Sequence, residues 1–539
     1  MRRQGENVRV RNRATWVALP ASAALTAALL SGCGVGEGDS AGQGQQIVMG
    51  MTDDVLATDP ASGYDPGSWL VFNNVFQSLL SFPKGGTQPQ PEAAEKCEFQ
   101  DGESKVFSCT LQDGLTFSNG NDLTSKDVKH SFDRTLRIDD ADGPAVMLQS
   151  IDRIETPDDL TVVFHLNTSD ATFPQKIASG AGSIVDHREY PADELRTDGE
   201  AVGSGVYTME SFGPKEAVFA PNSGYRGPAE VQNSGLTVKF YDDPGKLKAA
   251  VEEERVDIAY RHLATEDLAE LEASATSAQT DIQVVQGTSA EVHHLVFNHD
   301  HPVTGKLGVR QAIAYLVDRS TLIRDVYART AEPLYSIVPA GITGHNTAFF
   351  DRYGQRPQPA KAEEALAAEG ITEPVELTLW STPVRYGAQT DEELAAIAEQ
   401  LNASGLFDVQ VRSVDLEQYE KDIADGKYGV YVKGWVPDYP DADNFTAPFF
   451  GKDNVLGNNY DAGEITGEIL PRAAAESSRA ATVGDFGALQ DLVAEELPLL
   501  PIWQGKQYAV AQDGVSGLEW TLDSSTVFRF WEISKTPES

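Results

Sequence analysis

Hydrophobic positions between residues 375 and 433 switch between the spacing of strands and the spacing of helices. Strands are predicted at 375–380, 407–414 and 428–433. A helix is predicted from Thr390 to Gly405, with Glu393 placed to complete a cap at Thr390. A second helix ends at Gly426. This alternation predicts a parallel or mixed sheet with crossover helices, whose ligands would bind outside the carboxyl ends of the strands.

Before residue 300 the apolar pattern is less regular and predicts a mixture of strands and helices. A strand is expected at 47–51 and a helix around 69–80. Within 81–200, Thr124 and Asp127 have the spacing of a capping box, which predicts a helix beginning there. The remaining elements expected from the pattern are strands at 161–166, 207–212 and 236–241, and helical spacing over 309–326.

Two loops follow neighbouring predicted strands and carry opposite charges. The loop 381–386 contains Arg385, and the loop 434–445 contains Asp438 between two prolines. One cation and one anion at the same edge of a sheet could hold the two ends of a zwitterion such as a peptide. The alternative is that Arg385 and Asp438 pair with each other or with water. Aromatic residues in these loops offer flat apolar contact; they are Tyr386, Trp435 and Tyr439.

Length and charge narrow the class of protein. A chain of 539 residues is expected to form two or three domains. It carries 82 acidic and 42 basic residues, a formal net charge of −40. A surface this acidic argues against nucleic acid or an anionic membrane as a direct partner.

The N-terminal segment is interpreted as a targeting signal. Arginines precede an apolar stretch at 16–30 that is too short for a confident membrane span, and Leu-Ser-Gly-Cys33 follows. This ending resembles the bacterial lipobox, which predicts a signal peptide at 1–32, a diacylated Cys33 and a flexible Gly-rich tether at 33–46. The alternative is a chance cysteine after a signal peptide.

The two other cysteines, Cys97 and Cys109, lie on either side of a predicted turn between two β-rich arms. In an exported chain this arrangement predicts a structural disulfide rather than a metal site or a catalytic thiol. Four histidines also invite a metal interpretation. Because neighbours on a strand point to opposite faces, a structural role is favoured for these residues, which are His293, His294, His299 and His301. We expect no metal and no cofactor.

Enzyme motifs do not stand out from the sequence. The chain has no Gly-Lys-Ser/Thr phosphate loop, so any ATPase would be a separate chain. It has no nucleophile elbow in a plausible context. Nothing singles out a carboxylate pair for glycoside hydrolysis among the acids. A secreted hydrolase is therefore the more remote alternative, and we expect that the protein is not an enzyme.

Four segments, read in order, resemble one known family. They are Gly120-Asn-Asp-Leu-Thr-Ser-Lys-Asp-Val-Lys-His-Ser-Phe132, Gly203-Ser-Gly-Val-Tyr207, Val309-Arg-Gln-Ala-Ile-Ala-Tyr315 followed by Val317-Asp318, and Gly434-Trp-Val-Pro-Asp438 followed by Asn444-Phe445. The chain from about residue 47 to its end resembles the bacterial extracellular solute-binding proteins of family 5, the dipeptide- and oligopeptide-binding proteins of ABC importers.

The resemblance implies a fold and a division into domains. The fold would be α/β, two-lobed and three-domain, of the periplasmic-binding-protein kind (type II, peptide-binding cluster), with mixed sheets. Lobe I would combine 47–80, 201–293 and 506–539, with 81–200 as an inserted subdomain, and lobe II would be 294–505. The hinge crossings would lie near 292–298 and 502–508.

The resemblance also implies a ligand site. In this family the Asp of the Gly-Trp-x-x-Asp loop pairs with the α-amino group of the peptide, which transfers to Asp438, with Trp435 as a pocket wall. Dipeptide-binding members place an Arg for the α-carboxylate in the loop matching 382–386. Here Arg385 stands one residue closer to the Pro-Val than in those members. Tyr386 and Tyr439 complete the expected ligand contacts.

The function implied is that of a lipid-anchored binding component of an ABC importer. It would capture peptides in a closing cleft outside the cytoplasmic membrane, in the periplasmic or extracellular space, and deliver them to permease subunits. It would touch the membrane only through its lipid and act as a monomer. The alternative within the same fold is a non-peptide ligand: a nickel chelate, an oligosaccharide or an opine.

Overall fold

The computed structural model describes residues 44–536, except residues 262, 278–280, 329, 384, 388 and 453. The predicted signal peptide, Cys33 and all but the last residues of the predicted tether lie outside the described residues. Within the described ranges, no helix is both long enough and apolar enough to cross a membrane.

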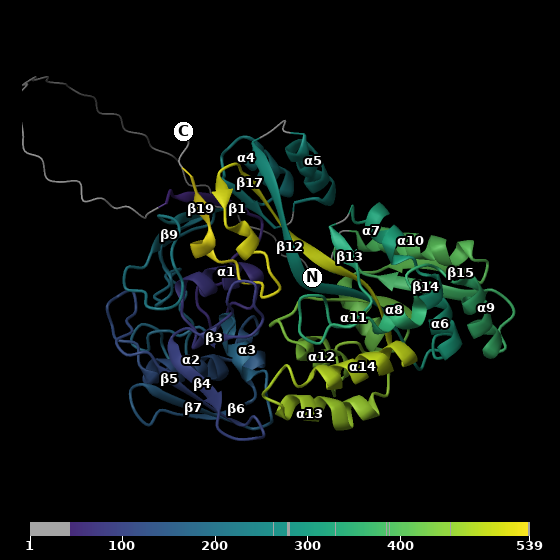
Figure 1. Ribbon diagram of the computed structural model, residues 1–539, viewed down its shortest axis with the longest axis horizontal. Helices are drawn as coiled ribbons and strands as arrows, with labels where there is room; N and C mark the ends of the chain where they lie inside the picture. The colour runs from purple at the N-terminus through teal and green to yellow at the C-terminus, as the bar shows by residue number, and fades with distance from the viewer. Residues whose placement is uncertain are drawn as a thin grey trace, which may run out of the picture. The chain divides into compact units, whose positions relative to one another are not determined.

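One large mixed sheet runs through the structure (Figure 1). Its strand order is β15 (Phe407–Ser413), β14 (Val375–Ser381), β16 (Val430–Trp435), β12 (Ile282–Phe297), β17 (Leu499–Gln512), β11 (Ile258–Tyr260), β1 (Ile47–Met51), β10 (Leu236–Phe240), β9 (Glu216–Pro221) and β8 (Tyr207–Phe212), with β13 (Ala331–Pro333) paired to β17. β14 is parallel to both β15 and β16, whereas β12 is antiparallel to β16 and β17. The prediction of a mixed α/β architecture is confirmed.

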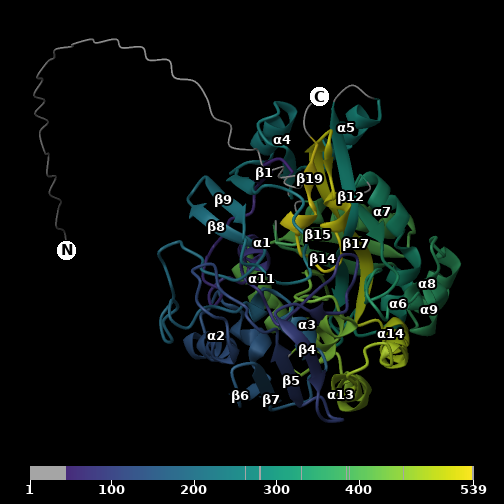
Figure 2. The ribbon, with the colours of Figure 1, turned by 60° about the vertical axis from the view of Figure 1, so that its left-hand side comes forward.

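β12 and β17 are the longest strands and lie side by side in both views (Figures 1 and 2). One end of each packs in a C-terminal core, the buried apolar residues between Ala290 and Trp503. The other end of each reaches the cores of the N-terminal part. Their pairing register shifts between Thr288 and Val292, where the C-terminal core begins. A bulge of this kind bends a strand at the point where it passes between two packed cores.

Helices cover the faces of the C-terminal part of the sheet and surround its edge. They are α6 (Leu307–Leu316), α7 (Arg319–Asp325), α8 (Ala348–Tyr353), α9 (Pro359–Ala368), α10 (Thr390–Ala403), α11 (Leu416–Ala424), α12 (Ala447–Phe450), α13 (Leu470–Ala475) and α14 (Val483–Glu496). The helices of the N-terminal part are α1 (Pro66–Val75), α4 (Pro244–Glu252) and α5 (Thr265–Thr276).

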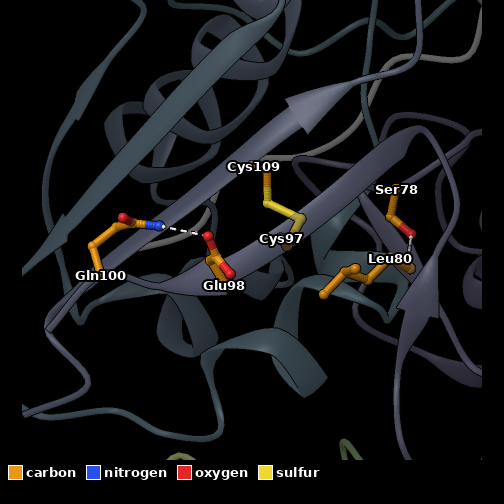
Figure 3. Close-up of a disulfide and its surroundings, with 6 residues drawn as sticks. All are labelled: Ser78, Leu80, Cys97, Glu98, Gln100 and Cys109. Atoms are coloured by element: carbon orange, nitrogen blue, oxygen red, sulfur yellow. Dashed lines mark hydrogen bonds between the residues drawn. A yellow bond between two sulfur atoms is a disulfide. The ribbon is translucent and has the colours of Figure 1, made fainter. Parts of the chain in front are cut away.

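Residues 79–184 build a separate core around a four-stranded antiparallel sheet. The sheet order is β4 (Ala94–Phe99), β5 (Val106–Leu111), β7 (Thr161–Leu166) and β6 (Ile151–Glu155), accompanied by α2 (Ser125–Ile138), α3 (Phe173–Ile177) and a small sheet of β2 (Leu80–Ser81) and β3 (Gln90–Pro91). The predicted capping box at Thr124 is confirmed, since Asp127 accepts from the Thr124 backbone N–H at 2.8 Å. Cys97 and Cys109 are directly opposite on β4 and β5 and are joined by a disulfide (Figure 3).

The glycines of the Gly203-Ser-Gly-Val-Tyr207 segment lie against the end of α1. A Cβ atom on Gly203 would lie 2.0 Å from the carbonyl oxygen of Val75. Gly205 donates its backbone N–H to the same oxygen at 2.8 Å. Only glycine permits this approach, because a larger residue would push its own backbone away from the helix end. The C-terminal segment closes the N-terminal core with a two-stranded pairing of β18 (Val515–Ser516) and β19 (Ser534–Lys535). The division into lobes and an inserted subdomain stays a prediction.

Candidate functional site

The loop containing Asp438 leaves the sheet at the end of β16. β16 extends two residues beyond its predicted end, because Gly434 and Trp435 still pair with β12. Asn444 then closes the loop on itself. Its side-chain oxygen accepts from the Trp435 indole N–H and from the Asp438 backbone N–H, both at 3.0 Å. Its amide nitrogen donates to Asp438 Oδ2 at 3.2 Å, which fixes the orientation of that carboxylate.

Asp438 receives a second hydrogen bond from far away in the sequence. The Tyr64 hydroxyl donates to Asp438 Oδ1. Asp438 is half-buried, and burial raises the pKa of its carboxyl, while the hydrogen bonds from Tyr64 and Asn444 and the charge of Lys176 act in the opposite direction. Among the described residues, no Lys, Arg or His forms an ion pair with Asp438. In the described part of the chain, its carboxylate therefore has two neutral side-chain donors and no contacting cation.

A buried ion pair fixes the base of this loop. Arg479 and Asp441 are each 3% exposed and pair through two hydrogen bonds, of 2.9 and 2.7 Å. Asp441 also accepts from the backbone N–H of Asp443 at 2.9 Å, at the start of the short 3-10 helix Ala442–Phe445 that contains Asn444. The position of Asp438 thus depends, through Asn444, on this ion pair.

Tyr439 lies where the loop packs on the 79–184 core. Its side chain is 6% exposed, its hydroxyl donates to Asp443 Oδ2 at 3.1 Å, and the Lys176 ammonium lies 5.8 Å from its ring centroid. Burial raises the pKa of both Tyr439 and Asp443. The structure gives Tyr439 a packing position between two parts of the chain, and a ligand contact by this residue stays a prediction.

The second loop meets the first, as the strand order predicted. Tyr386 is half-buried, and a Cβ atom on Gly434 would lie 3.1 Å from its ring. Arg385 is exposed, with its guanidinium carbon 6.0 Å from the centroid of the Tyr386 ring. In the part of the chain that the structure describes, Arg385 and Asp438 form no ion pair with each other, so the alternative of a mutual pair does not hold here.

His293 belongs to a buried network beside these loops. It is 1% exposed, and its Nδ1 lies 3.0 Å from the carboxylate of Glu393. Glu393 also accepts from the Trp503 indole N–H at 2.9 Å and from the Tyr327 hydroxyl. The prediction that Glu393 caps Thr390 is wrong, because its carboxylate is turned into this network and α10 begins at Thr390 itself.

The other histidines pack separately instead of converging on a common point. His294 is fully buried against Phe449, and burial lowers its pKa to about 3. His299 packs on Tyr460, and burial lowers its pKa to about 4. Within the described ranges, the one group with metal-ligating geometry is elsewhere, formed by Asp127, Asp186 and His187. Arg188 already supplies a cation there, donating to Asp186 at 2.6 Å.

Sequence reasoning missed Tyr64 and Lys176. Both lie in the N-terminal part and reach the Asp438 loop only through tertiary contacts, so no local motif marks them. Two cavities, of about 430 and 470 Å³, also lie outside this site. Neither is lined by any of the five residues expected to contact a ligand.

Comparisons with known proteins agree with one family. The model of the bacterial extracellular solute-binding proteins, family 5 (middle) matches residues 88–457. The probable D,D-dipeptide-binding periplasmic protein DdpA of Escherichia coli (strain K12) is 24% identical, over 91% of this chain and 94% of its own length. Di/tripeptide-binding protein 1 of Pseudomonas aeruginosa (strain UCBPP-PA14) is 25% identical, over 88% of this chain and 92% of its own length. The solved structure of the periplasmic murein tripeptide-binding protein MppA, in an unliganded open form, aligns with a TM-score of 0.80 at 18% identity, covering 92% of this chain and 99% of MppA.

Proposed function

Because the chain belongs to the bacterial extracellular solute-binding proteins of family 5, we propose that it captures peptides and delivers them to the permease of an ABC importer. The observation that carries this proposal is the carboxylate of Asp438. It is half-buried, oriented by Asn444 and Tyr64, and without a contacting cation among the described residues. A peptide ammonium is the cation that this carboxylate would bind, because burial without a partner charge is unfavourable for a carboxylate.

Trp435, Tyr386 and Arg385 are the other proposed contacts. Trp435 is half-buried with its indole N–H fixed on Asn444, so its ring has a defined orientation and offers an apolar wall. Arg385 is exposed and free to reach the carboxylate of a short peptide. Tyr386 lies between Arg385 and Gly434 and would line the same site.

Ligand capture would use a hinge in β12 and β17. The register shift between Thr288 and Val292 marks where β12 passes from the N-terminal cores to the C-terminal core. Lobe I would consist of 47–80, 201–293 and 506–539 with 81–200 inserted, and lobe II of 294–505. Closure gains contacts from both lobes only when a ligand lies between them.

The remaining parts of the proposal concern the setting of the protein. It would be a monomeric, non-enzymatic component, held outside the cytoplasmic membrane by lipid on Cys33, with the ATPase of the importer on another chain. The relatives named above are binding proteins, which supports a binding role without catalysis.

Small-angle scattering and mass spectrometry on one sample test this function. The purified protein is first unfolded and refolded to release any bound ligand, and then mixed with a defined library of two- to five-residue peptides. We expect a smaller radius of gyration with the library than without it, and peptides recovered from the washed complex by mass spectrometry. An N-acetylated copy of the library is the control. Equal recovery of both libraries, or no peptide recovered, would contradict the proposal.

A further inference from the structure

One of the two cavities lies in the N-terminal part and is lined by no residue of the Asp438 loop. Its volume is about 430 Å³, within the range of roughly 300–1,000 Å³ that small-molecule sites occupy. It lies between the N-terminal core and the 79–184 core, since residues of both line it. Its walls come from α1, the segments 78–92, 178–183 and 205–206, the loop 225–232 and the C-terminal segment 527–532.

One wall of this cavity holds the buried carboxylate of Glu92. Glu92 is 7% exposed and accepts three hydrogen bonds: from the Tyr225 hydroxyl at 2.8 Å, and from the Gln77 amide and the Ser81 hydroxyl, each at 3.2 Å. All three donors are neutral. Among the described residues, no Lys, Arg or His forms an ion pair with Glu92. Burial raises the pKa of its carboxyl, as expected for an acid without a cation.

The two cations that line the cavity are already paired with other acids. Lys84 lies 3.1 Å from Glu532, and Arg529 lies 3.0 Å from Asp523. A further lining acid, Glu230, is exposed and has no ion pair in the described part of the chain. The charges around the cavity therefore leave an excess of negative potential, which attracts a small cation.

Five aromatic residues also line the cavity. They are Phe72, Phe76, Phe82, Tyr225 and Trp531. Aromatic faces attract cations electrostatically, and the effect is strongest for cations without a tightly held hydration shell. Alkylated ammonium ions fit this description, since their charge is spread over an apolar surface.

We propose that this cavity is a second ligand site and binds a small alkylated ammonium ion, with Glu92 as the charge partner and the aromatic rings as the wall. Three of the acceptor positions of Glu92 are already used, which leaves little capacity for the N–H donors of a primary amine. An ion that needs charge and apolar contact, but few hydrogen bonds, is therefore favoured. This inference does not depend on peptide binding, because the two sites share no residue.

Titration calorimetry with choline tests this proposal, with dimethylbutanol as the neutral isostere of the same shape. We expect choline to bind the wild type at least tenfold more tightly than the neutral isostere. Glu92→Gln should lower choline affinity by about tenfold or more, which corresponds to about 1.4 kcal/mol, because the variant removes the charge partner and keeps the aromatic residues of the wall. The substitution keeps an acceptor for Tyr225 and Gln77, so the local hydrogen bonds persist.

A second variant blocks the cavity without changing its charge. Ala229 lines the cavity, and Ala229→Phe should fill it and block choline while Glu92 keeps its charge. A far-UV circular dichroism spectrum that matches the wild type serves as the check that both variants fold. Choline binding should also survive Asp438→Ala. Equal affinities for choline and dimethylbutanol, no binding at about 10 mM choline, or loss of choline binding in Asp438→Ala would overturn the proposal.

Discussion

Removing the buried charge of Arg479 should release the Asp438 loop. Its guanidinium and the carboxylate of Asp441 are each 3% exposed, and Arg479 also donates to the carbonyl of Ala473 at 2.8 Å. Arg479→Met keeps much of the side-chain volume but leaves Asp441 buried without a cation. Breaking a buried pair in this way costs about 3–5 kcal/mol, because the remaining charge has lost its hydration.

Arg472 provides a matched control in the same region. It forms an ion pair with Asp485 at 2.7 Å, but the two side chains are 56% and 23% exposed. Exposed pairs contribute about 0–1 kcal/mol, so Arg472→Met should change little. Both variants remove a guanidinium from an ion pair of nearly the same N–O distance. The two ion pairs differ in how deeply they are buried.

Native-state hydrogen exchange, followed by mass spectrometry of peptides that cover 434–446, measures the effect locally. In Arg479→Met, protection of this segment from exchange should fall by about two to three orders of magnitude, because each 1.4 kcal/mol of lost stability is a factor of ten. In Arg472→Met, protection should fall by less than tenfold. Asp441→Asn combined with Arg479→Met should recover part of the protection, because no uncompensated charge remains. Equal protection in the two single variants would refute the reasoning that Asp441 and Arg479 fix the loop.

Two further predictions concern the anchor and the pH dependence of binding. Cys33→Ser should release the protein from the membrane fraction or leave it unprocessed in the bacterial host, as shown by fractionation and intact-mass analysis; a processed, membrane-bound variant would contradict lipid anchoring. Burial raises the pKa of Asp438, and a bound ammonium favours the charged carboxylate, so peptide affinity should fall as pH is lowered through that raised pKa. The same titration should be flat for Asp438→Asn, and an unchanged slope in this variant would assign the pH dependence to another group.

The sheet of the C-terminal part could be predicted because its signals are local. Apolar spacing predicted strands at 375–380, 407–414 and 428–433, close to β14, β15 and β16, together with the helices between them. Their parallel order places the Arg385 and Asp438 loops at one edge. Each of these signals lies within a dozen residues of the chain. The disulfide was predictable for the same reason, since a hairpin brings Cys97 opposite Cys109.

Errors arose where a tertiary contact decided the local structure. The helix expected at 69–80 ends at Val75, whose carbonyl accepts from Gly205 in a distant segment. The interruption of the helical spacing over 309–326 at Val317 has a local cause instead: the Asp318 side chain accepts from the Thr321 backbone N–H at 3.1 Å and starts α7. Spacing alone cannot show this break, since the apolar faces of α6 and α7 both belong to the C-terminal core.

Tyr64 was missed in the candidate site for the same reason, because its role depends on a tertiary contact. Tyr64 lies 374 positions before Asp438 in the chain, in a turn-rich segment with no motif. Its hydroxyl becomes a donor to the carboxylate only in the folded chain. Glu393 has the spacing of a cap, yet a buried histidine, a tyrosine and a tryptophan compete successfully for its oxygens.

Double substitution of protein and ligand tests the central claim that Asp438 holds the α-amino group of a peptide. Calorimetry measures the affinity of the wild type and of Asp438→Ala, each for a peptide and for the N-acetylated form of that peptide. The control variant is Asp425→Ala, because Asp425 is an exposed acid in the same part of the chain. Either single change should weaken binding by about two to three orders of magnitude, from the 3–5 kcal/mol lost when a buried charge loses its partner. Acetylation should add little further loss in Asp438→Ala, because both changes remove one interaction. Additive losses, with each change exerting its full effect in the presence of the other, would contradict the claim.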